Sequence, residues 1–335
     1  MKQRTASLGI TLGVLLLVLA IPAVREVAWG FLDGALGGRN HFNLWSTMSR
    51  ASVIVGMAMA VLVAFRAGLI NLGGEGQLVL GGLTAAMIGI YVELPEGAPP
   101  ALLALLALTA AMLVSGLWAL FAGWLDRGLG IPLLVGSLLL NYPANQFASW
   151  LVSHPLRDVM SGVAQSHKID AAARLPRFPG TIMDYGVFIV LLVVVLVIWF
   201  ERNSVLGYRI RMHGYSSAFA KASGLPTTKL YYQSLFISGA LAGLVGFIVV
   251  FGFSQRYIDG MLTAPLYAWT GVVAVLLAST VPWLVPVSAT AFAILATGAG
   301  GMERVAGIPR EVAQVIQGLV ILWLAASSCS LHRDR

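Results

Sequence analysis

The sequence predicts an all-α polytopic membrane protein with about ten transmembrane helices, some of them short or broken. Of the 335 residues, 58% are hydrophobic and only 10% are charged, and the mean hydropathy is +0.85. Soluble domains carry roughly 25% charged residues, so this composition excludes an ordinary soluble fold. Apolar stretches long enough to cross a bilayer recur along the whole chain.

These stretches form one expected transmembrane domain, residues 1–335. The spans are expected near residues 7–24, 46–65, 73–92, 101–124, 131–152, 183–200, 231–253, 267–282, 284–299 and 312–328. Two connections are long, an external loop at 153–182 and a cytoplasmic loop at 201–230. The N-terminal stretch 1–24 combines a basic start with an apolar core, which is typical of a cleaved signal peptide or of an uncleaved first span. We expect the span, because the spans that follow need no separate export signal.

The basic residues favour a defined orientation rather than a nucleic-acid partner. The formal net charge is +7, but the basic residues are dispersed among the loops between spans. Attraction to the acidic headgroups of the lipid bilayer or to a cytoplasmic partner explains this pattern more simply than nucleic-acid binding. The loop 201–230 carries five basic residues and one acidic residue. It is therefore expected in the cytoplasm, together with both chain termini.

Several kinds of chemistry have no motif in this sequence. The single cysteine, Cys329, excludes an internal disulfide and a cysteine-based metal cluster. The five histidines lack the spacing of a zinc enzyme, and no GxxxxGK[ST] motif is present to bind ATP. No GxSxG motif and no intramembrane pair of aspartates occurs either. We therefore expect no catalytic residues, no metal and no cofactor bound by this chain.

The stretch RAGLINLGGEGQ, residues 66–77, interrupts two apolar runs with polar side chains and four glycines. Glycines loosen a helix, and irregular backbone within a bilayer is tolerated only where protein buries it or water reaches it. An intramembrane carboxylate indicates a functional site by default. Asn71, Glu75 and Gln77 are therefore candidates to line a solute pathway. The alternative is a polar cytoplasmic turn in which Glu75 is hydrated or paired with Arg66.

The stretch SLLLNYPANQFASWL, residues 137–151, places amides in an otherwise apolar helix. Asn141 and Asn145 are four residues apart, so they share one face of the helix, and Pro143 is expected to bend it. Amides facing a cavity can bind an uncharged polar solute, and Tyr142 can stack on it. The alternative is that the amides only bond neighbouring helices together.

Two further segments have patterns typical of a short surface helix and of close helix packing. Residues 216–223 are compatible with a short surface helix that ends before Gly224 and Pro226. Such a helix on a membrane-surface loop is suited to pressing into a cytosolic partner, and the alternative is a solvated basic loop. The GALAG sequence at 239–243 has the GxxxG spacing of close helix packing.

Several of these stretches resemble the membrane permease subunits of bacterial ABC importers. The similar segments are GLINLGGEGQ at 68–77, LNYPA at 140–144, HPLRDVMSGVAQS at 154–166, LGYRIRMHGYSSAFAKASGL at 206–225, GVVAVLLAS at 271–279 and GIPREVAQVIQGLVIL at 307–322. The likeness is to the nucleoside and simple-sugar type, related to branched-chain amino acid and ribose permeases. The chain departs from that pattern at Pro143, at His213 in place of valine and at Phe219 in place of alanine.

The resemblance implies a non-catalytic permease subunit in the bacterial cytoplasmic (inner) membrane. The expected solute is a nucleoside, with a simple sugar as the alternative. The implied pathway residues are Asn71, Glu75, Gln77, Asn141, Tyr142 and Asn145. The residues implied to couple the loop 201–230 to the ATPase are Gly207, Tyr208, Arg209, Arg211, Gly214, Ala218, Ala220 and Gly224. We expect changes at Arg209 or Gly214 to leave the fold intact but to uncouple ATP hydrolysis from uptake.

The implied partners are a separate ABC ATPase subunit, an extracytoplasmic substrate-binding protein and a second permease. The second permease would form a heterodimer, and a homodimer is the alternative. ATP and magnesium would bind the ATPase rather than this chain. Two other classes stand beside this interpretation. One is an ion-coupled secondary transporter with Glu75 as the coupling carboxylate, and the other is a membrane enzyme, for which the sequence offers no catalytic cluster.

Overall fold

The computed structural model describes residues 22–38, 41–309, 311–312 and 315, and its regular elements in these ranges are helices. The bounds are α2 Pro22–Leu36, α3 Phe42–Arg66, α4 Gly74–Tyr91, α5 Pro100–Leu129, α6 Leu133–Leu139, α7 Asn141–Ser153, α8 Gly186–Asn203, α9 Val205–Tyr215, α10 Ser217–Ala222, α11 Thr227–Ile248, the π-helix η2 Val249–Ser254, α12 Tyr267–Leu277 and α13 Val285–Ala306. The all-α prediction is therefore confirmed for these residues.

Five helical segments of the described residues are long and apolar enough to cross a membrane. These are Phe42–Arg66, Pro100–Leu129, Gly186–Asn203, Thr227–Ser254 and Val285–Ala306. The expected spans near 7–24 and 312–328 lie largely outside the described residues. The count of about ten helices stays a prediction.

The chain divides into two compact units, which are considered separately. One comprises residues 1–48 and 291–335, and the other comprises residues 49–290. In the described part of the first unit, the backbones of Gly34 in α2 and Gly301 in α13 meet so closely that a Cβ on either glycine would collide with the other. Met302 packs with Phe31 beside this crossing. Glycine at both positions is what lets the two helices touch.

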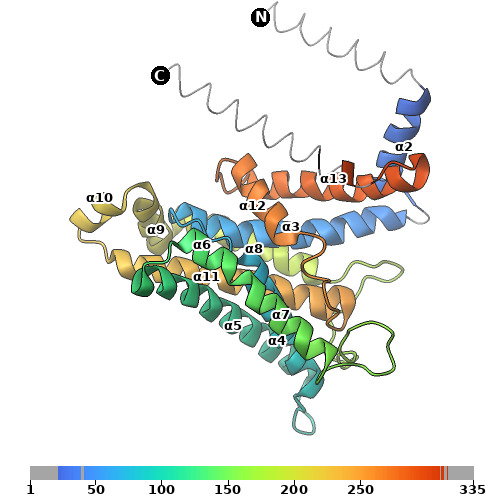
Figure 1. Cartoon of the computed structure of the whole chain (residues 1–335), viewed down its shortest axis with the longest axis horizontal. Helices are drawn as coiled ribbons and strands as arrows, with labels where there is room; N and C mark the ends of the chain where they lie inside the picture. Colours follow the sequence, from blue (N-terminus) through green and yellow to red (C-terminus); the bar gives the residue numbers. More distant parts are fainter. Residues whose placement is uncertain (1–21, 39–40, 310, 313–314, 316–335) are drawn as a thin grey trace, which may run out of the picture. The chain divides into compact units, whose positions relative to one another are not determined.

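The centre of the second unit is a bundle of α4, α5 and α11, which lie side by side (Figure 1). A Cβ on Gly243 of α11 would lie 2.6 Å from the Ser115 hydroxyl of α5. A Cβ on Gly246, one turn on, would lie 2.5 Å from the Leu78 carbonyl oxygen of α4. The close packing predicted from the GALAG sequence is therefore confirmed, and it extends along α11 to a second helix.

The span expected at 131–152 is broken into α6 and α7 at Leu140. Pro143 lies in the first turn of α7 and has no N–H to donate to the carbonyl of Leu139, so the helix cannot continue regularly through this point. The break confirms that some of the expected spans are interrupted. It also sets the first turn of α7, with its amides, against the start of α4.

Different connecting segments of the chain lie at the two ends of α11 (Figure 1). At its start, α11 follows α10 after residues 223–226, and the Ala220 carbonyl of α10 accepts a hydrogen bond from Leu225 N at 3.0 Å. Near its other end, Leu175 N donates to the Phe251 carbonyl at 3.1 Å. The residues between α7 and α8, 154–185, therefore lie at the opposite end of α11 from α9 and α10.

The segment 154–185 is ordered by its own polar residues. The Asp158 carboxylate accepts a hydrogen bond from Met160 N at 3.1 Å, and the Ser166 hydroxyl accepts one from Tyr257 N at 2.9 Å. The Asp184 carboxylate accepts a hydrogen bond from Gly186 N at 2.7 Å. Burial raises the pKa of the Tyr257 hydroxyl. The motif residues of this loop thus fix its shape.

Candidate functional site

The side chain of Asn71 shapes the connector between α3 and α4, residues 67–73. Asn71 is only 3% exposed, and its Oδ1 accepts a hydrogen bond from Gly73 N at 2.9 Å. This bond closes an Asx-turn that leads into α4. The same Oδ1 lies 3.4 Å from Nε2 of Gln77, which is also buried. Asn71 and Gln77 therefore shape the connector from inside the protein.

Asn141 holds the start of α4 in place. Its Oδ1 accepts from Gly76 N at 2.8 Å, and its Nδ2 donates to the Leu72 carbonyl at 3.0 Å. Gly76 N is one of the first N–H groups of α4, which find no acceptor within their own helix. One turn before Asn141, Ser137 Oγ accepts from Leu72 N at 3.0 Å. The interrupted helix α6–α7 thus supplies the cap that α4 lacks in its own sequence.

Glu75 lies in the first turn of α4 and is held by two donors. Its Oε1 accepts from Asn145 Nδ2 at 2.7 Å, and its Oε2 accepts from Trp269 Nε1 of α12 at 3.1 Å. A carboxylate is also favoured at a helix N-terminus by the helix dipole. Three separate helices therefore converge on one negatively charged group. The Asn145 amide has a fixed orientation, because its NH₂ rather than its oxygen must face the carboxylate.

A small pocket opens beside this carboxylate. Its volume is about 150 Å³, and it is lined by Glu75, Leu138, Asn141, Tyr142, Asn145 and Trp269. The lining offers a carboxylate and two amides next to two aromatic rings. The Tyr142 side chain is 68% exposed, so the pocket opens at the surface of this unit. These groups can accept hydrogen bonds from a polar solute and stack on a flat one.

Of the six residues predicted to line a pathway, four line this pocket and two lie behind it. Glu75, Asn141, Tyr142 and Asn145 belong to the lining, whereas Asn71 in the connector and Gln77 in α4 are buried. The alternative in which Glu75 pairs with Arg66 is wrong. Arg66 Nε instead contacts Glu201 Oε2 at 3.0 Å, tying the end of α3 to the end of α8. Glu75 faces α7 and α12 instead.

The eight residues predicted to couple the chain to an ATPase divide by exposure. Tyr208, Arg209 and Ala218 are exposed, and Arg211 is partly buried. Gly207 and Ala220 are buried, Gly214 is partly buried, and Gly224 is exposed. A Cβ on Gly207 or Gly214 would collide with a backbone carbonyl oxygen, of Phe200 and of Arg66 respectively. The expectation that Gly214 can be changed without disturbing the fold is therefore wrong, because the contact is backbone against backbone.

The predicted surface helix is α10, one residue shorter at each end than expected. Ser216 caps it by accepting a hydrogen bond from Phe219 N at 3.2 Å. Gly224, just beyond its end, has φ +76, a conformation that favours glycine. Tyr215 and Phe219 are exposed on either side of the cap.

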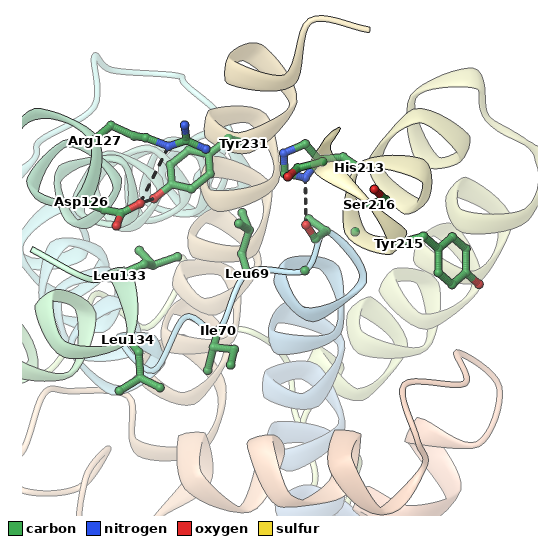
Figure 2. A pocket seen from close by; sticks show the side chains of 14 residues that line it. Leu69, Ile70, Asp126, Arg127, Leu133, Leu134, His213, Tyr215, Ser216 and Tyr231 are labelled. Carbon is green, nitrogen blue, oxygen red and sulfur yellow. Dashed lines mark hydrogen bonds and ion pairs between the residues drawn. The ribbon is translucent and has the colours of Figure 1, made fainter. Parts of the chain in front are cut away.

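A second pocket lies between this segment and the connector (Figure 2). Its volume is about 380 Å³, and it is lined by residues 67–70, 126–127, 133–134, 213–217 and 231. On one wall, the Tyr231 hydroxyl donates to Asp126 Oδ2 at 2.6 Å, and the Arg127 guanidinium lies 4.5 Å from the centre of the Tyr231 ring. The end of α9 and the connector thus line the same pocket.

Sequence reasoning missed three residues at these sites. Trp269 sits in an apolar helix with no motif, so nothing local could have assigned it to Glu75. Ser137 could have been found, because it precedes Asn141 by four residues and shares its face. His213 was noted only as a departure from a family pattern, although its ring contacts the connector.

Comparison with known proteins identifies the family. The family model described as branched-chain amino acid transport system / permease component matches residues 43–325. The chain belongs to this family. It is accordingly a permease subunit of an ABC importer and a multi-pass membrane protein. Membership implies a separate ATPase and a substrate-binding protein as partners.

Curated relatives of the permease cover most of both chains. It is 28% identical to the glucose ABC transporter permease protein TsgB13 of Haloferax volcanii over 94% of this chain and 83% of the relative. It is 27% identical to the guanosine ABC transporter permease protein NupP of Bacillus subtilis, over 96% and 91%. It is 23% identical to the nucleoside ABC transporter permease protein NupB of Lactococcus lactis, over 89% and 83%. No solved structure matches the chain.

Proposed function

We propose that this permease forms part of the route by which an importer carries a nucleoside across the cytoplasmic membrane. The observation that carries the proposal is the Glu75 carboxylate, held by Asn145 and Trp269 at the edge of a polar pocket. An ionisable group among apolar helices is expensive and indicates a functional site.

The chemistry of the pocket suits an uncharged solute with hydroxyl or amine donors. Glu75 can accept hydrogen bonds from such donors, and Asn141 and Asn145 line the same pocket. Trp269 and Tyr142 offer flat faces to a planar base. The guanosine and nucleoside permeases among the relatives support a nucleoside. A simple sugar is the second candidate, supported by the glucose permease relative.

A second permease subunit would complete the pocket. About 150 Å³ is smaller than the roughly 300 Å³ at which cavities for small organic ligands begin. Tyr142 lines the pocket and is exposed, so this side of the pocket needs a partner or water. A heterodimer of two permeases provides a second wall, and a homodimer is the alternative.

The segment α9–α10 would receive the force of ATP hydrolysis from the cytoplasmic side. Arg209, Tyr208 and Ala218 are exposed there and can contact an ATPase subunit. ATP and magnesium would bind that subunit, and an extracytoplasmic binding protein would deliver the solute at the opposite end, where residues 154–185 lie. This orientation puts both termini in the cytoplasm, with about ten spans in the full chain.

The test is uptake by proteoliposomes that contain the permease, its partner permease, the ATPase and the binding protein. We expect ATP-dependent uptake of radiolabelled guanosine, unaffected by excess glucose. In Glu75→Gln, the negative charge is lost, and the Asn145 amide must turn over to meet the new NH₂ group with its oxygen. Uptake should then fall at least about tenfold, the scale of one lost charged hydrogen bond.

The matched control is Glu93→Gln, a change of the same kind at an exposed carboxylate after α4. This variant should transport guanosine like the unaltered complex. If the Glu75→Gln variant transports guanosine at the unaltered rate, Glu75 does not line the solute route. Uptake of glucose in place of guanosine would favour the sugar-importing alternative.

A further inference from the structure

The last turn of α9 is joined to the α3–α4 connector by a histidine hydrogen bond. His213 Nδ1 lies 3.0 Å from the carbonyl oxygen of Ala67, and the ring is only 6% exposed (Figure 2). A carbonyl oxygen only accepts, so Nδ1 carries the hydrogen. Ala67 directly follows α3, where the carbonyls have lost their helical donors. His213 therefore supplies, from a distant part of the chain, a donor that α3 lacks.

Beside this bond, two glycines bring the two backbones into contact. A Cβ on Gly214 would collide with the Arg66 carbonyl oxygen and would lie 2.9 Å from Gly68 N. Gly68 has φ +74, and a Cβ on it would lie 3.1 Å from the Cα of Gly214. No flexible side chain lies between the backbones to absorb a displacement. The end of α9 and the connector are thus constrained to move together.

The connector is short and bonded along its length up to the carboxylate. Leu69 N donates to the Ala64 carbonyl, Asn71 N donates to the Leu69 carbonyl, and Gly73 N, two residues before Glu75, donates to Asn71 Oδ1. A displacement at Ala67 is therefore passed to the first turn of α4. The pocket of about 380 Å³ beside the junction leaves room for such a displacement on one side.

We propose that His213 and Gly214 tie the α9–α10 segment to the connector, so that movement of α9–α10 shifts Glu75 and changes the pocket around it. His213 is a positioning residue in this account, since it acts on Glu75 through the backbone of residues 67–74. The proposal rests on the proposed function, in which α9–α10 receives the movement of the ATPase.

The test compares three substitutions of His213 in the reconstituted complex. His213→Leu removes the donor. His213→Asn keeps a donor nitrogen bonded to Cγ, as Nδ1 is, whereas His213→Gln places the donor one bond further out. We measure ATP hydrolysis stimulated by the binding protein, solute uptake and the thermal midpoint of the purified complex.

The expected result is a loss of coupling rather than a loss of the complex. In His213→Leu, ATP hydrolysis persists and uptake per ATP falls about fivefold, the scale of one buried hydrogen bond. In His213→Asn, uptake per ATP returns close to the unaltered value, and in His213→Gln it does not. If the leucine variant fails to assemble, the comparison of Asn with Gln decides the question.

Two results would overturn the proposed link between α9–α10 and the connector. One is unchanged uptake per ATP in His213→Leu. The other is an equal loss of hydrolysis, uptake and thermal midpoint in the Asn and Gln variants, which describes a residue that only stabilises the fold. By contrast, an unaltered complex that hydrolyses ATP without transporting any nucleoside or sugar would overturn the proposed function, and the tie with it.

Discussion

Asn141 and Asn145 lie one turn apart on the same face of α7 and have different roles. Both polar groups of Asn141 bond the backbone at the start of α4, at Gly76 N and the Leu72 carbonyl. Asn145 instead gives its NH₂ to the Glu75 carboxylate. The first residue positions a helix, and the second holds the charged group that borders the pocket. The alternative in which the amides bond neighbouring helices together therefore holds for Asn141, and the pathway role of Asn145 stays a prediction.

Alanine at each position should separate these roles. Asn141→Ala leaves the buried Gly76 N–H and the partly buried Leu72 carbonyl without this partner, which costs roughly 1–3 kcal/mol of stability. We expect a lower thermal midpoint for the purified permease. Asn145→Ala leaves Glu75 its bond from Trp269, so the midpoint should change less while solute uptake falls more. If the two variants lose the same amount of thermal midpoint and the same amount of solute uptake, Asn141 and Asn145 do not have separate roles.

The spacing of these amides was readable in the sequence, but their partners were not. A separation of four residues places Asn141 and Asn145 on one helix face whatever lies opposite. Glu75 lies 70 residues from Asn145 and 194 from Trp269, and such long-range contacts leave no local pattern. Sequence reasoning therefore found the groups of the pocket on α4 and α7 but not the tryptophan that completes it.

At the scale of elements, α9 and α10 combine a fixed backbone with an exposed polar surface. Gly207 and Gly214 pack against carbonyls of neighbouring segments, and Ala220 is fully buried. Arg209 and Tyr208 remain exposed on the same short helix. A rigid element with free side chains is suited to transmitting force from a partner, because little of the displacement is lost within the element itself.

Charge reversal at Arg209 tests this assignment. Arg209→Glu changes only an exposed side chain, so the permease should fold and insert normally. Like charges across an interface cost several kcal/mol, so we expect ATPase co-purification and uptake to fall at least about tenfold. Arg202→Glu, at the exposed end of α8, is the matched control. Normal ATPase binding by Arg209→Glu, or an equal loss in both variants, would count against a specific contact.

At the scale of the whole molecule, the sequence predicted the class of fold better than its packing. Hydropathy predicted the helices, and Pro143 predicted a bend near the point where the structure divides the span into α6 and α7 at Leu140. The GxxxG spacing at 239–243 predicted a close contact but could not name α5 as the partner, because such spacing describes only one of the two surfaces. The exposed apolar side chains of α5 and α8 fit lipid, whereas the exposed Tyr142 of α7 lines a pocket that also holds a carboxylate and two amides. That difference leads to the central claim, that Glu75 borders a water-filled solute pathway rather than lipid.

Thiol labelling at Tyr142 tests the claim most directly. The permease has a single cysteine, so Cys329→Ser provides a thiol-free background for Tyr142→Cys and for Leu192→Cys on the exposed apolar face of α8. A membrane-impermeant reagent reacts with the thiolate, which forms in water and not in hydrocarbon. In the assembled complex, the account predicts that the cysteine at position 142 is labelled rapidly, that guanosine slows its labelling and that the cysteine at 192 stays unlabelled. Equally slow labelling at the two positions, unaffected by guanosine, would contradict it.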